Sequence, residues 1–333
     1  MKGIFLNKTP SKLSKIFTDA TYAELSRVID IPRKGYTVSD LADDPDAFSK
    51  VEIVFSSWGM PTLDEGEIAR LLPSLKAVFY AAGSVQSFAR PFLARGVRVF
   101  SAWGANAIPV AEVAAAEIVL ANKGYFVSSR SFKSEGHEAA RRRRGICRGN
   151  YGEEVGIIGA GMIGRKVISL LKNYRLRVLV FDPFLSDERA KELGVERVQL
   201  TELFSRCMAV SNHLANNAET VGMLRYEHFS AMRENGVFIN TGRGAQVVEQ
   251  DLVRALTERP DLTALLDVTY PEPPEEGHPF YTLPNCILSP HLAGSFGREV
   301  GRMGDYMLSE LRRYLAGEAC PWEVTAAMLT TMA

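Results

Sequence analysis

Three segments in the second half of the chain carry side chains suited to acid–base and anion-binding chemistry. They are Asn240-Thr241-Gly242-Arg243-Gly244, Leu266-Asp267-Val268 with Glu272-Pro273, and Ser289-Pro290-His291-Leu292-Ala293-Gly294-Ser295. A positioned imidazole can protonate an oxygen that gains negative charge, and a neighbouring carboxylate favours the protonated ring. The planar fork of an arginine can bond both oxygens of a carboxylate. Arg243, Glu272 and His291 therefore supply a cation, an acid and a titratable imidazole.

Taken singly, these residues have simpler structural explanations. Arg243 could form a surface ion pair, Glu272 could be a solvated loop acid, and His291 could be a packed loop histidine. However, each residue follows a predicted strand, and ligands of open α/β sheets bind beyond the carboxyl ends of the strands. We therefore expect the three side chains to converge on one crevice.

A glycine-rich turn precedes these segments and has the form GxGxxG. It comprises Gly159, Ala160, Gly161, Met162, Ile163 and Gly164. The motif alone is weak evidence, but here a buried strand is predicted before it and an apolar helical pattern follows it. The first glycine permits the tight turn, the second lets the backbone approach a pyrophosphate, and the third lets the helix lie close to the strand. These features predict a dinucleotide site at a helix N-terminus, with a flavodoxin-like turn as the alternative.

An acidic residue at the end of the next strand bears on the choice of cofactor. The strand predicted over Arg177 to Phe181 ends at Asp182, eighteen residues after Gly164. A carboxylate at this position can accept hydrogen bonds from both ribose hydroxyls and repels a 2′-phosphate. NAD is therefore expected rather than NADP, although Arg175 and Arg177 leave NADP open as an alternative.

Two series of β-rich segments position these residues. The first series is Lys2 to Leu6, Val51 to Phe55, Ala77 to Tyr80 and Val97 to Phe100, and the second is Val155 to Ile158, Val178 to Phe181, Ala209 to Asn212, Val237 to Asn240, Leu265 to Val268 and Ile287 to Ser289. These β-rich segments alternate with segments of helical pattern, and such alternation is typical of parallel sheets whose strands are linked by helices. We predict an α/β protein with two Rossmann- or flavodoxin-like domains and a cleft between them. Residues 1–102 with 296–333 would form the substrate-binding domain, and residues 103–295 the NAD-binding domain.

A helix is expected from Ile108 to Lys123, with Pro109 as its first residue. Its apolar stripe consists of Val110, Val113, Ala114, Ile118 and Ala121. We expect this region to form a homodimer, and packing between the domains is the alternative use of the stripe.

Composition limits the classes of partner and compartment. The 333 residues include 39 basic and 39 acidic side chains, so the net charge of zero does not favour nucleic acid. The four cysteines lack a CxxC spacing, which indicates neither a metal site nor a disulfide framework. No stretch reaches the roughly 18 consecutive apolar residues of a membrane helix. We expect a soluble, cytoplasmic protein without a metal, nucleic-acid or membrane partner.

The chain resembles the D-isomer-specific 2-hydroxyacid dehydrogenases. The resemblance runs from Ala81-Ala82-Gly83 through Val110-Ala111-Glu112 and the glycine turn to Pro290-His291-Leu292-Ala293-Gly294-Ser295. It implies that Arg243 holds the substrate carboxylate and carbonyl, that His291 moves the proton, and that Glu272 pairs with His291. It implies hydride transfer between NAD and a small 2-keto or D-2-hydroxy acid.

The resemblance also assigns residues around the reacting groups. Asp267 would bind the nicotinamide carboxamide, with a strand-end cap as the alternative, and the backbone amides of Ala82 and Gly83 would bind the substrate carboxylate. The resemblance also implies that Thr241 binds the cofactor.

The sequence departs from the family pattern in two loops. The loop that starts at Ala81 lacks both acids of G-x-G-x-D-x-x-D, and the segment His213 to Asn217 lacks the H-x-P-x-T spelling. Trp58 follows a strand of the first domain, where it could line the cleft or pack in the core. If Trp58 lines the cleft, a small or apolar 2-keto acid suits the site better than a phosphorylated one.

Two alternative functions share this fold. A formate dehydrogenase is disfavoured by Glu272, because that enzyme has glutamine at the corresponding position. An NAD-sensing corepressor is the alternative from a different functional class, and the absence of a nucleic-acid-like charge disfavours it.

Overall fold

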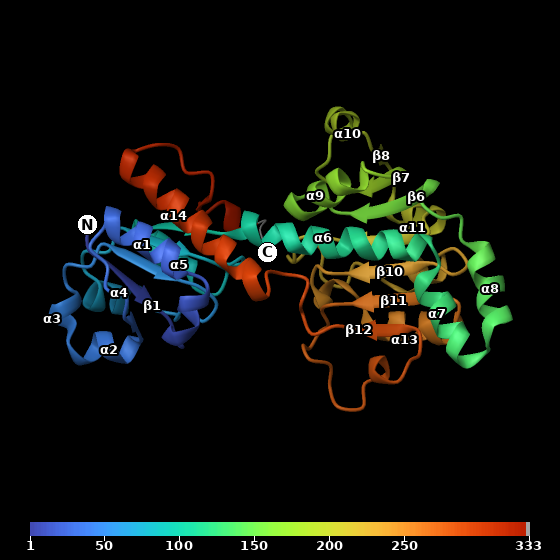
Figure 1. The fold of residues 1–333 in the computed structure, drawn as a ribbon, viewed down its shortest axis with the longest axis horizontal. Helices are drawn as coiled ribbons and strands as arrows, with labels where there is room; N and C mark the ends of the chain where they lie inside the picture. The colour runs from blue at the N-terminus through green and yellow to red at the C-terminus, as the bar shows by residue number, and fades with distance from the viewer. Residues whose placement is uncertain (331–333) are drawn as a thin grey trace. The chain divides into compact units, whose positions relative to one another are not determined.

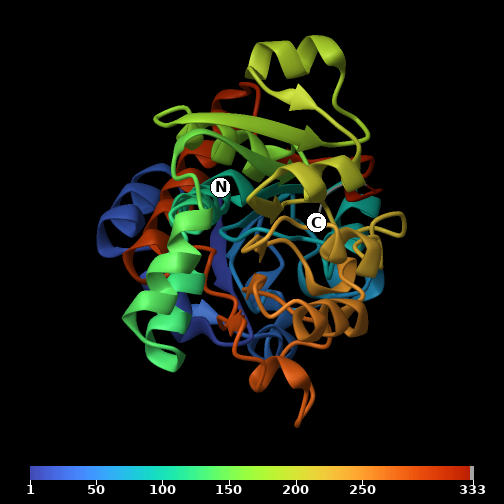
Figure 2. The ribbon, with the colours of Figure 1, turned by 90° about the vertical axis from the view of Figure 1, so that its right-hand side faces the viewer.

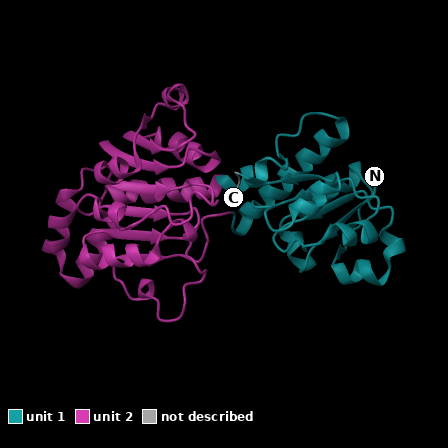
Figure 3. Ribbon diagram, turned by 180° about the vertical axis from the view of Figure 1, so that it is seen from behind, with its two compact units in different colours: residues 1–107, 295–333 teal, residues 108–294 magenta. Residues whose placement is uncertain are grey.

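The structure is a computed structural model that describes residues 1–330, so positions 331–333 of the predicted first domain lie outside the described residues. Two compact units are present (Figure 3): Met1–Ala107 with the segment that begins at Ser295, and Ile108–Gly294. We call them unit 1 and unit 2. Both contain mostly parallel sheets flanked by helices, which confirms the predicted α/β class with two domains.

Unit 1 has a sheet with the strand order β13-β5-β4-β3-β1-β2 in the described part of the chain. The strands are β1 (Gly3–Leu6), β2 (Gly35–Tyr36), β3 (Ile53–Ser56), β4 (Ala77–Tyr80), β5 (Arg98–Ser101) and β13 (Glu323–Val324). The helices are η1 (Pro10–Lys15), α1 (Asp19–Val28), α2 (Val38–Asp43), α3 (Pro45–Phe48), α4 (Glu65–Leu71), α5 (Ala89–Ala94), η4 (Gly297–Glu299), α14 (Val300–Ala316) and η5 (Met328–Thr330). Only β13 pairs antiparallel among these strands.

Apolar side chains on both faces of β1, β3 and β4 explain why helices cover this sheet on two sides. One face packs against α3, α4 and α5. The other packs against η1, α1 and α14, around a row of phenylalanine rings formed by Phe5, Phe55, Phe79 and Phe100. The C-terminal helix α14 therefore completes the core of unit 1.

Unit 2 has a sheet with the order β12-β11-β10-β9-β6-β7-β8. The strands are β6 (Tyr151–Ile158), β7 (Arg175–Phe181), β8 (Glu196–Arg197), β9 (Ala209–Asn212), β10 (Val237–Asn240), β11 (Thr263–Leu266) and β12 (Cys286–Leu288). The helices are α7 (Tyr125–Ser134), α8 (His137–Ile146), α9 (Met162–Leu171), α10 (Asp187–Leu193), α11 (Leu200–Arg206), α12 (Tyr226–Ser230), η2 (Gly244–Gln246), α13 (Glu249–Glu258) and η3 (Pro279–Tyr281). All these strands pair in parallel, so their carboxyl ends share one edge.

Two helical layers cover the sheet of unit 2 (Figures 1 and 2). α9, α10 and the helix α6 (Trp103–Asn122) contribute to one core cluster, and α11, α12 and α13 contribute to the other. The central strands β9, β10 and β11 are buried along their whole length. Side chains at the shared strand edge are consequently held on a rigid, doubly covered support.

Helix α6 differs from the prediction at its start. It begins at Trp103 rather than at Pro109, and Pro109 lies inside it. The expected stripe also has a different role, because Ala114, Ile118 and Ala121 are buried in the core of unit 2. The helix is long and apolar enough to cross a membrane by composition alone, but more than half of that window is buried inside the protein. This burial is typical of a core helix.

Three short strands were not predicted. The strands β2, β8 and β13 contain two residues each. Each lies at an edge of its sheet and pairs with a single neighbouring strand. A two-residue segment carries no alternation of apolar and polar side chains, so no period could reveal it.

Candidate active site

The glycine turn links β6 to α9, as the sequence predicts. Gly159 has a φ of +91°, and a Cβ on Gly164 would lie 1.9 Å from the carbonyl oxygen of Gly159. By contrast, a Cβ on Gly161 would meet no atom within 4 Å. Gly161 is also the N-cap of α9, and no side chain caps this helix. The open space in front of uncapped N–H groups fits the pyrophosphate of a dinucleotide.

Asp182 lies directly after β7 and braces this turn. Its carboxylate accepts hydrogen bonds from the N–H of Ala160 at 2.6 Å and from the N–H of Phe184 at 2.8 Å. These two donors fix the carboxylate beside the turn. Each oxygen retains a lone pair, so the group can still accept a hydroxyl hydrogen bond.

Glu272 and His291 lie against each other at the strand edge of unit 2. The Nδ1 atom of His291 and the Oε1 atom of Glu272 are 2.7 Å apart, and both side chains are partly exposed. Since Nδ1 faces the carboxylate, Nε2 is the ring nitrogen left for a substrate. His291 has a φ of +52°, which a non-glycine residue adopts only when its surroundings hold it there.

Arg243 follows β10 and joins this pair. Its Nη1 atom donates to the carbonyl oxygen of Gly242 at 2.8 Å, which leaves other N–H groups of the guanidinium for an anion. Burial lowers the pKa of Arg243, and the negative charge of Glu272 opposes that shift. The structure therefore brings Arg243, Glu272 and His291 into one cluster in unit 2.

Asp267 holds the segment that carries His291. Its carboxylate accepts hydrogen bonds from Ser289 Oγ (2.6 Å), Leu292 N (2.8 Å) and Ala293 N (2.9 Å), and its carbonyl accepts one from His291 N (3.0 Å). Both carboxylate oxygens are thus engaged by the protein. These contacts are those of a strand-end cap, the alternative that the sequence left open.

Thr241 and His213 lie together just after the ends of β10 and β9. The hydroxyl of Thr241 is 3.4 Å from Nδ1 of His213, whose Nε2 is 2.9 Å from the Oγ atom of Ser211. Burial lowers the pKa of His213 to about 3. His213 is therefore a neutral, packed histidine at neutral pH.

A buried amide network at the ends of β9 and β10 was not predicted. Asn212 Nδ2 donates to Asn240 Oδ1 (3.1 Å) and to Gln246 Oε1 (2.6 Å), and Gln246 Nε2 donates to the carbonyl of Leu214 (3.0 Å). Asn240 in turn donates to the carbonyl of Arg243. The sequence carried one signal for this network: β9 and β10 each end in an asparagine, and a buried amide needs hydrogen-bond partners.

In unit 1, the loop after β4 contains the predicted substrate amides. The N–H of Ala82 donates to the carbonyl of Tyr80 at 2.9 Å, so this predicted amide is already occupied. The N–H groups of Gly83, Ser84 and Val85 have no acceptor within residues 1–330. Ser101 Oγ donates to the carbonyl of Gly83 at 2.6 Å and thereby fixes the loop.

Trp58 lies after β3 in unit 1, and 45% of its surface is exposed. This exposure excludes the alternative that Trp58 packs in the core of unit 1. Asn7 donates to the carbonyl of Trp58 at 2.9 Å and holds the backbone at this point. The indole is available to contact a ligand.

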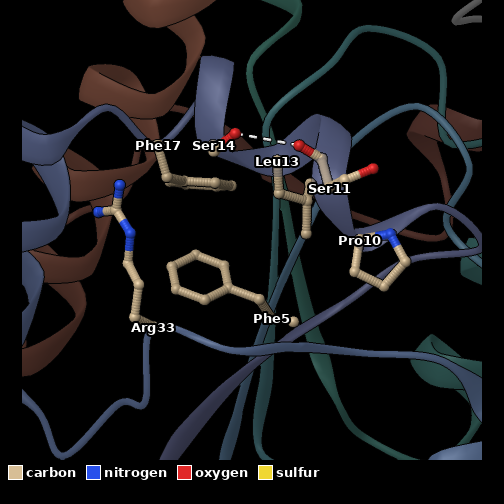
Figure 4. Close-up of a pocket in the computed structure, with 8 residues that line it drawn as sticks. Phe5, Pro10, Ser11, Leu13, Ser14, Phe17 and Arg33 are labelled. Carbon is tan, nitrogen blue, oxygen red and sulfur yellow. Dashed lines mark hydrogen bonds between the residues drawn. The ribbon is translucent and has the colours of Figure 1, made fainter.

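A separate cavity of about 330 Å³ lies in unit 1 beside η1 (Figure 4). Phe5, Leu13 and Phe17 form its apolar part, and Arg33 lies at its side. None of the residues predicted for catalysis or cofactor binding lines it. It is not part of the candidate active site.

Residues 118–293 match the family model described as "D-isomer specific 2-hydroxyacid dehydrogenase, NAD binding domain". A D-3-phosphoglycerate dehydrogenase of Archaeoglobus fulgidus is 33% identical over 60% of this chain and 38% of its own length. A glyoxylate reductase of Korarchaeum cryptofilum is 34% identical over 51% of this chain and 52% of its own. The chain spans about half the length of the curated relatives it matches.

Solved structures share the fold over nearly the whole chain. The apo form of D-mandelate dehydrogenase from Rhodotorula graminis has a TM-score of 0.80 and 20% identity, and covers 97% of both chains. A phosphoglycerate oxidoreductase from Rhizobium etli has a TM-score of 0.78 and 24% identity, over 98% of this chain and 99% of its own. At such identities the likeness establishes the fold alone.

Proposed function

The chain belongs to the family of D-isomer specific 2-hydroxyacid dehydrogenases, and on that premise we propose that it interconverts a small 2-keto acid and a D-2-hydroxy acid. The observation that carries the proposal is the 2.7 Å contact between His291 Nδ1 and Glu272 Oε1, with Arg243 beside it. This arrangement presents an imidazole nitrogen and an arginine fork at the strand edge that also bears the glycine turn.

Each residue of the cluster has a defined role in the proposed reduction. A nicotinamide cofactor held at the glycine turn would supply the hydride that reduces the keto carbon. Arg243 binds the substrate carboxylate and polarises the carbonyl, because its unpaired N–H groups form a planar fork. His291 donates its Nε2 proton to the oxygen as negative charge develops there, while Glu272 stabilises the imidazolium. The oxidation of the hydroxy acid uses the same groups in reverse.

We propose NAD as the cofactor, with NADP as the alternative. The Asp182 carboxylate, fixed beside the turn by two backbone donors, would accept the adenosine ribose hydroxyls and disfavour a 2′-phosphate. Arg175 and Arg177, the cations that kept NADP open, lie in the amino-terminal half of β7, whereas Asp182 follows the carboxyl end of that strand. Arg177 is already paired with Glu154 and Glu196, which supports NAD.

The proposed substrate is a small or apolar 2-keto acid. The exposed indole of Trp58 supports this class, because an aromatic surface suits an apolar substituent better than a phosphate does. The free N–H groups of Gly83 and Ser84 would add donors for the carboxylate.

Steady-state oxidation of NADH with a panel of 2-keto acids tests the function. Pyruvate, glyoxylate, phenylpyruvate and phosphohydroxypyruvate cover small, apolar and phosphorylated substrates. Turnover of the unphosphorylated acids supports the proposal, and a clear preference for phosphohydroxypyruvate would contradict the proposed substrate class. Tight NADH binding without any turnover would instead favour the NAD-sensing corepressor.

We also propose that the protein is a cytoplasmic homodimer. Leu120, Tyr125 and Phe132, from α6 and α7, are exposed large apolar side chains in the region after Ile108. A second copy would cover them in an isologous contact. Analytical ultracentrifugation of the wild type and of Tyr125→Glu with Phe132→Glu would distinguish a dimer from a monomer.

A further inference from the structure

Glu272 lies on a loop whose own backbone does little to hold it. Between the end of β11 at Leu266 and the start of η3 at Pro279, the chain forms no helix or strand. The backbone of Glu272 makes no hydrogen bond within residues 1–330, and 41% of its side chain is exposed. A loop of this kind keeps one position only through the contacts of its flanking residues. The carboxylate that faces His291 therefore depends on anchors elsewhere in the loop.

Glu249, the first residue of α13, contacts this loop on both sides of Glu272. Its Oε1 atom accepts a hydrogen bond from the backbone N–H of Tyr270 at 2.8 Å. Its Oε2 atom lies 3.6 Å from Nε2 of His278. Tyr270 comes before Glu272 in the chain, and His278 comes after it, next to η3. One carboxylate thus anchors both the beginning and the end of the loop.

These contacts are made from a buried and rigid support. Only 13% of the side chain of Glu249 and 20% of that of His278 are exposed. Leu252, Ala255 and Leu256 bury the same helix in the core of unit 2. An acid in the first turn of a helix is common, because it interacts favourably with the helix dipole. That explanation does not require both carboxylate oxygens to face the loop, as they do here.

The connection between β10 and α13 also carries Arg243. This residue follows β10, and the chain then passes through η2 to α13. A Cβ on Gly244 would lie 2.0 Å from the carbonyl carbon of Thr269, so the backbone of the loop lies directly against this connection. Glu249 therefore ties the loop that carries Glu272 to the segment that carries Arg243.

We propose that Glu249 is a positioning residue, which holds the loop so that Glu272 meets His291. The hydrogen bond from Tyr270 is the main anchor, and His278 adds a second one. In the part of the chain that the structure describes, Glu249 bonds neither His291 nor Glu272, so it acts through the loop. The catalytic consequence rests on the proposed function, in which Glu272 stabilises the imidazolium.

The first test examines the loop without turnover. Hydrogen exchange followed by NMR reports on the amide of Tyr270, because this amide donates to Glu249. Glu249→Ala should accelerate that exchange by about tenfold or more, whereas Glu249→Gln keeps an acceptor oxygen and should accelerate it by about threefold or less. Glu258→Ala is the matched control, since Glu258 lies on the same helix and bonds Tyr226 and Arg254 but not the loop. Unchanged exchange in Glu249→Ala would overturn the inference.

The second test connects the loop to catalysis. Glu249→Ala should lower kcat of keto-acid reduction by about fivefold to tenfold, and Glu249→Gln should restore most of it. The dissociation constant of NADH should stay within about twofold of the wild-type value, because the glycine turn is not involved. In a Glu272→Gln background, Glu249→Ala should have no further effect, since the group that it positions is already absent. A full additional loss in that background would overturn the inference.

Together the two tests separate this inference from the proposed function. If Glu249→Ala accelerates exchange at Tyr270 but the wild type reduces no keto acid, the proposed function fails and the anchoring of the loop stands. If the wild type reduces keto acids and exchange at Tyr270 is unchanged in Glu249→Ala, the inference fails alone. Accelerated exchange with a wild-type kcat would also overturn it, because Glu249 would then hold the loop without positioning Glu272.

Discussion

His291 offers the most direct test at the scale of single residues. Replacing it with alanine removes the proposed general acid and should lower kcat of keto-acid reduction by about 10²- to 10⁴-fold. The affinity for NADH should barely change, because the imidazole bonds Glu272 and not the glycine turn. Stopped-flow reduction and fluorescence titration of NADH measure the two quantities. Near-normal turnover would remove His291 from the mechanism.

The partner of the imidazole has a separate signature. Glu272→Gln keeps the size of the side chain but removes the charge that stabilises the imidazolium. The kcat of keto-acid reduction should therefore fall, whereas the circular dichroism spectrum should not change. An unchanged kcat would show that the 2.7 Å contact does not contribute to the reaction.

The sequence predicted the three residues of the cluster, Arg243, Glu272 and His291, better than it predicted the contacts that hold them in place. Arg243, Glu272 and His291 could be named because they follow strands whose apolar pattern is clear. Asp267 was expected to bind the nicotinamide carboxamide, with a strand-end cap as the alternative, and its contacts with Ser289, Leu292 and Ala293 are those of the cap. Sequence alone does not reveal that these donors converge on one carboxylate.

At the scale of elements, the glycine turn depends on close contact between β6 and α9. A methyl group on Gly164 would lie 1.9 Å from the backbone oxygen of Gly159, so Gly164→Ala must displace the helix from the turn. We expect the affinity for NADH to fall by tenfold or more, as calorimetry would show. Gly145→Ala is the matched control, because Gly145 lies in α8 with open space around its Cα. Equal affinity in both variants would contradict this role of Gly164.

The elements themselves followed from the hydrophobic pattern where that pattern was long. β4, β9 and β10 have the predicted bounds, because each is a short buried run that begins with apolar residues and is followed by a turn or loop. The start of α6 was wrong by several residues, since a proline was taken as the first helical residue and instead lies inside the helix. Packing in the core overrode this local signal.

At the scale of the whole molecule, two buried groups in unit 2 should give opposite dependences of stability on pH. The pKa of His213 is lowered to about 3, so from about pH 3 to 6.5 the unfolded chain binds a proton that the native protein does not. Its contribution to stability therefore rises with pH and is lost in acid. The pKa of Glu117 is raised to about 7, so from about pH 4.5 to 7 the native protein binds the extra proton. Its contribution falls as pH rises.

These two slopes should nearly cancel between about pH 4.5 and 6.5, and single substitutions should separate them. In Glu117→Gln the free energy of unfolding should rise with pH, and in His213→Gln it should fall, each by at most about 1.4 kcal/mol per pH unit relative to the wild type. Urea unfolding followed by fluorescence at pH 4.5, 5.5 and 6.5 measures these differences, and the double variant should return to the wild-type slope. Identical slopes in both single variants would mean that at least one of the two groups titrates in the folded protein as it does in the unfolded chain.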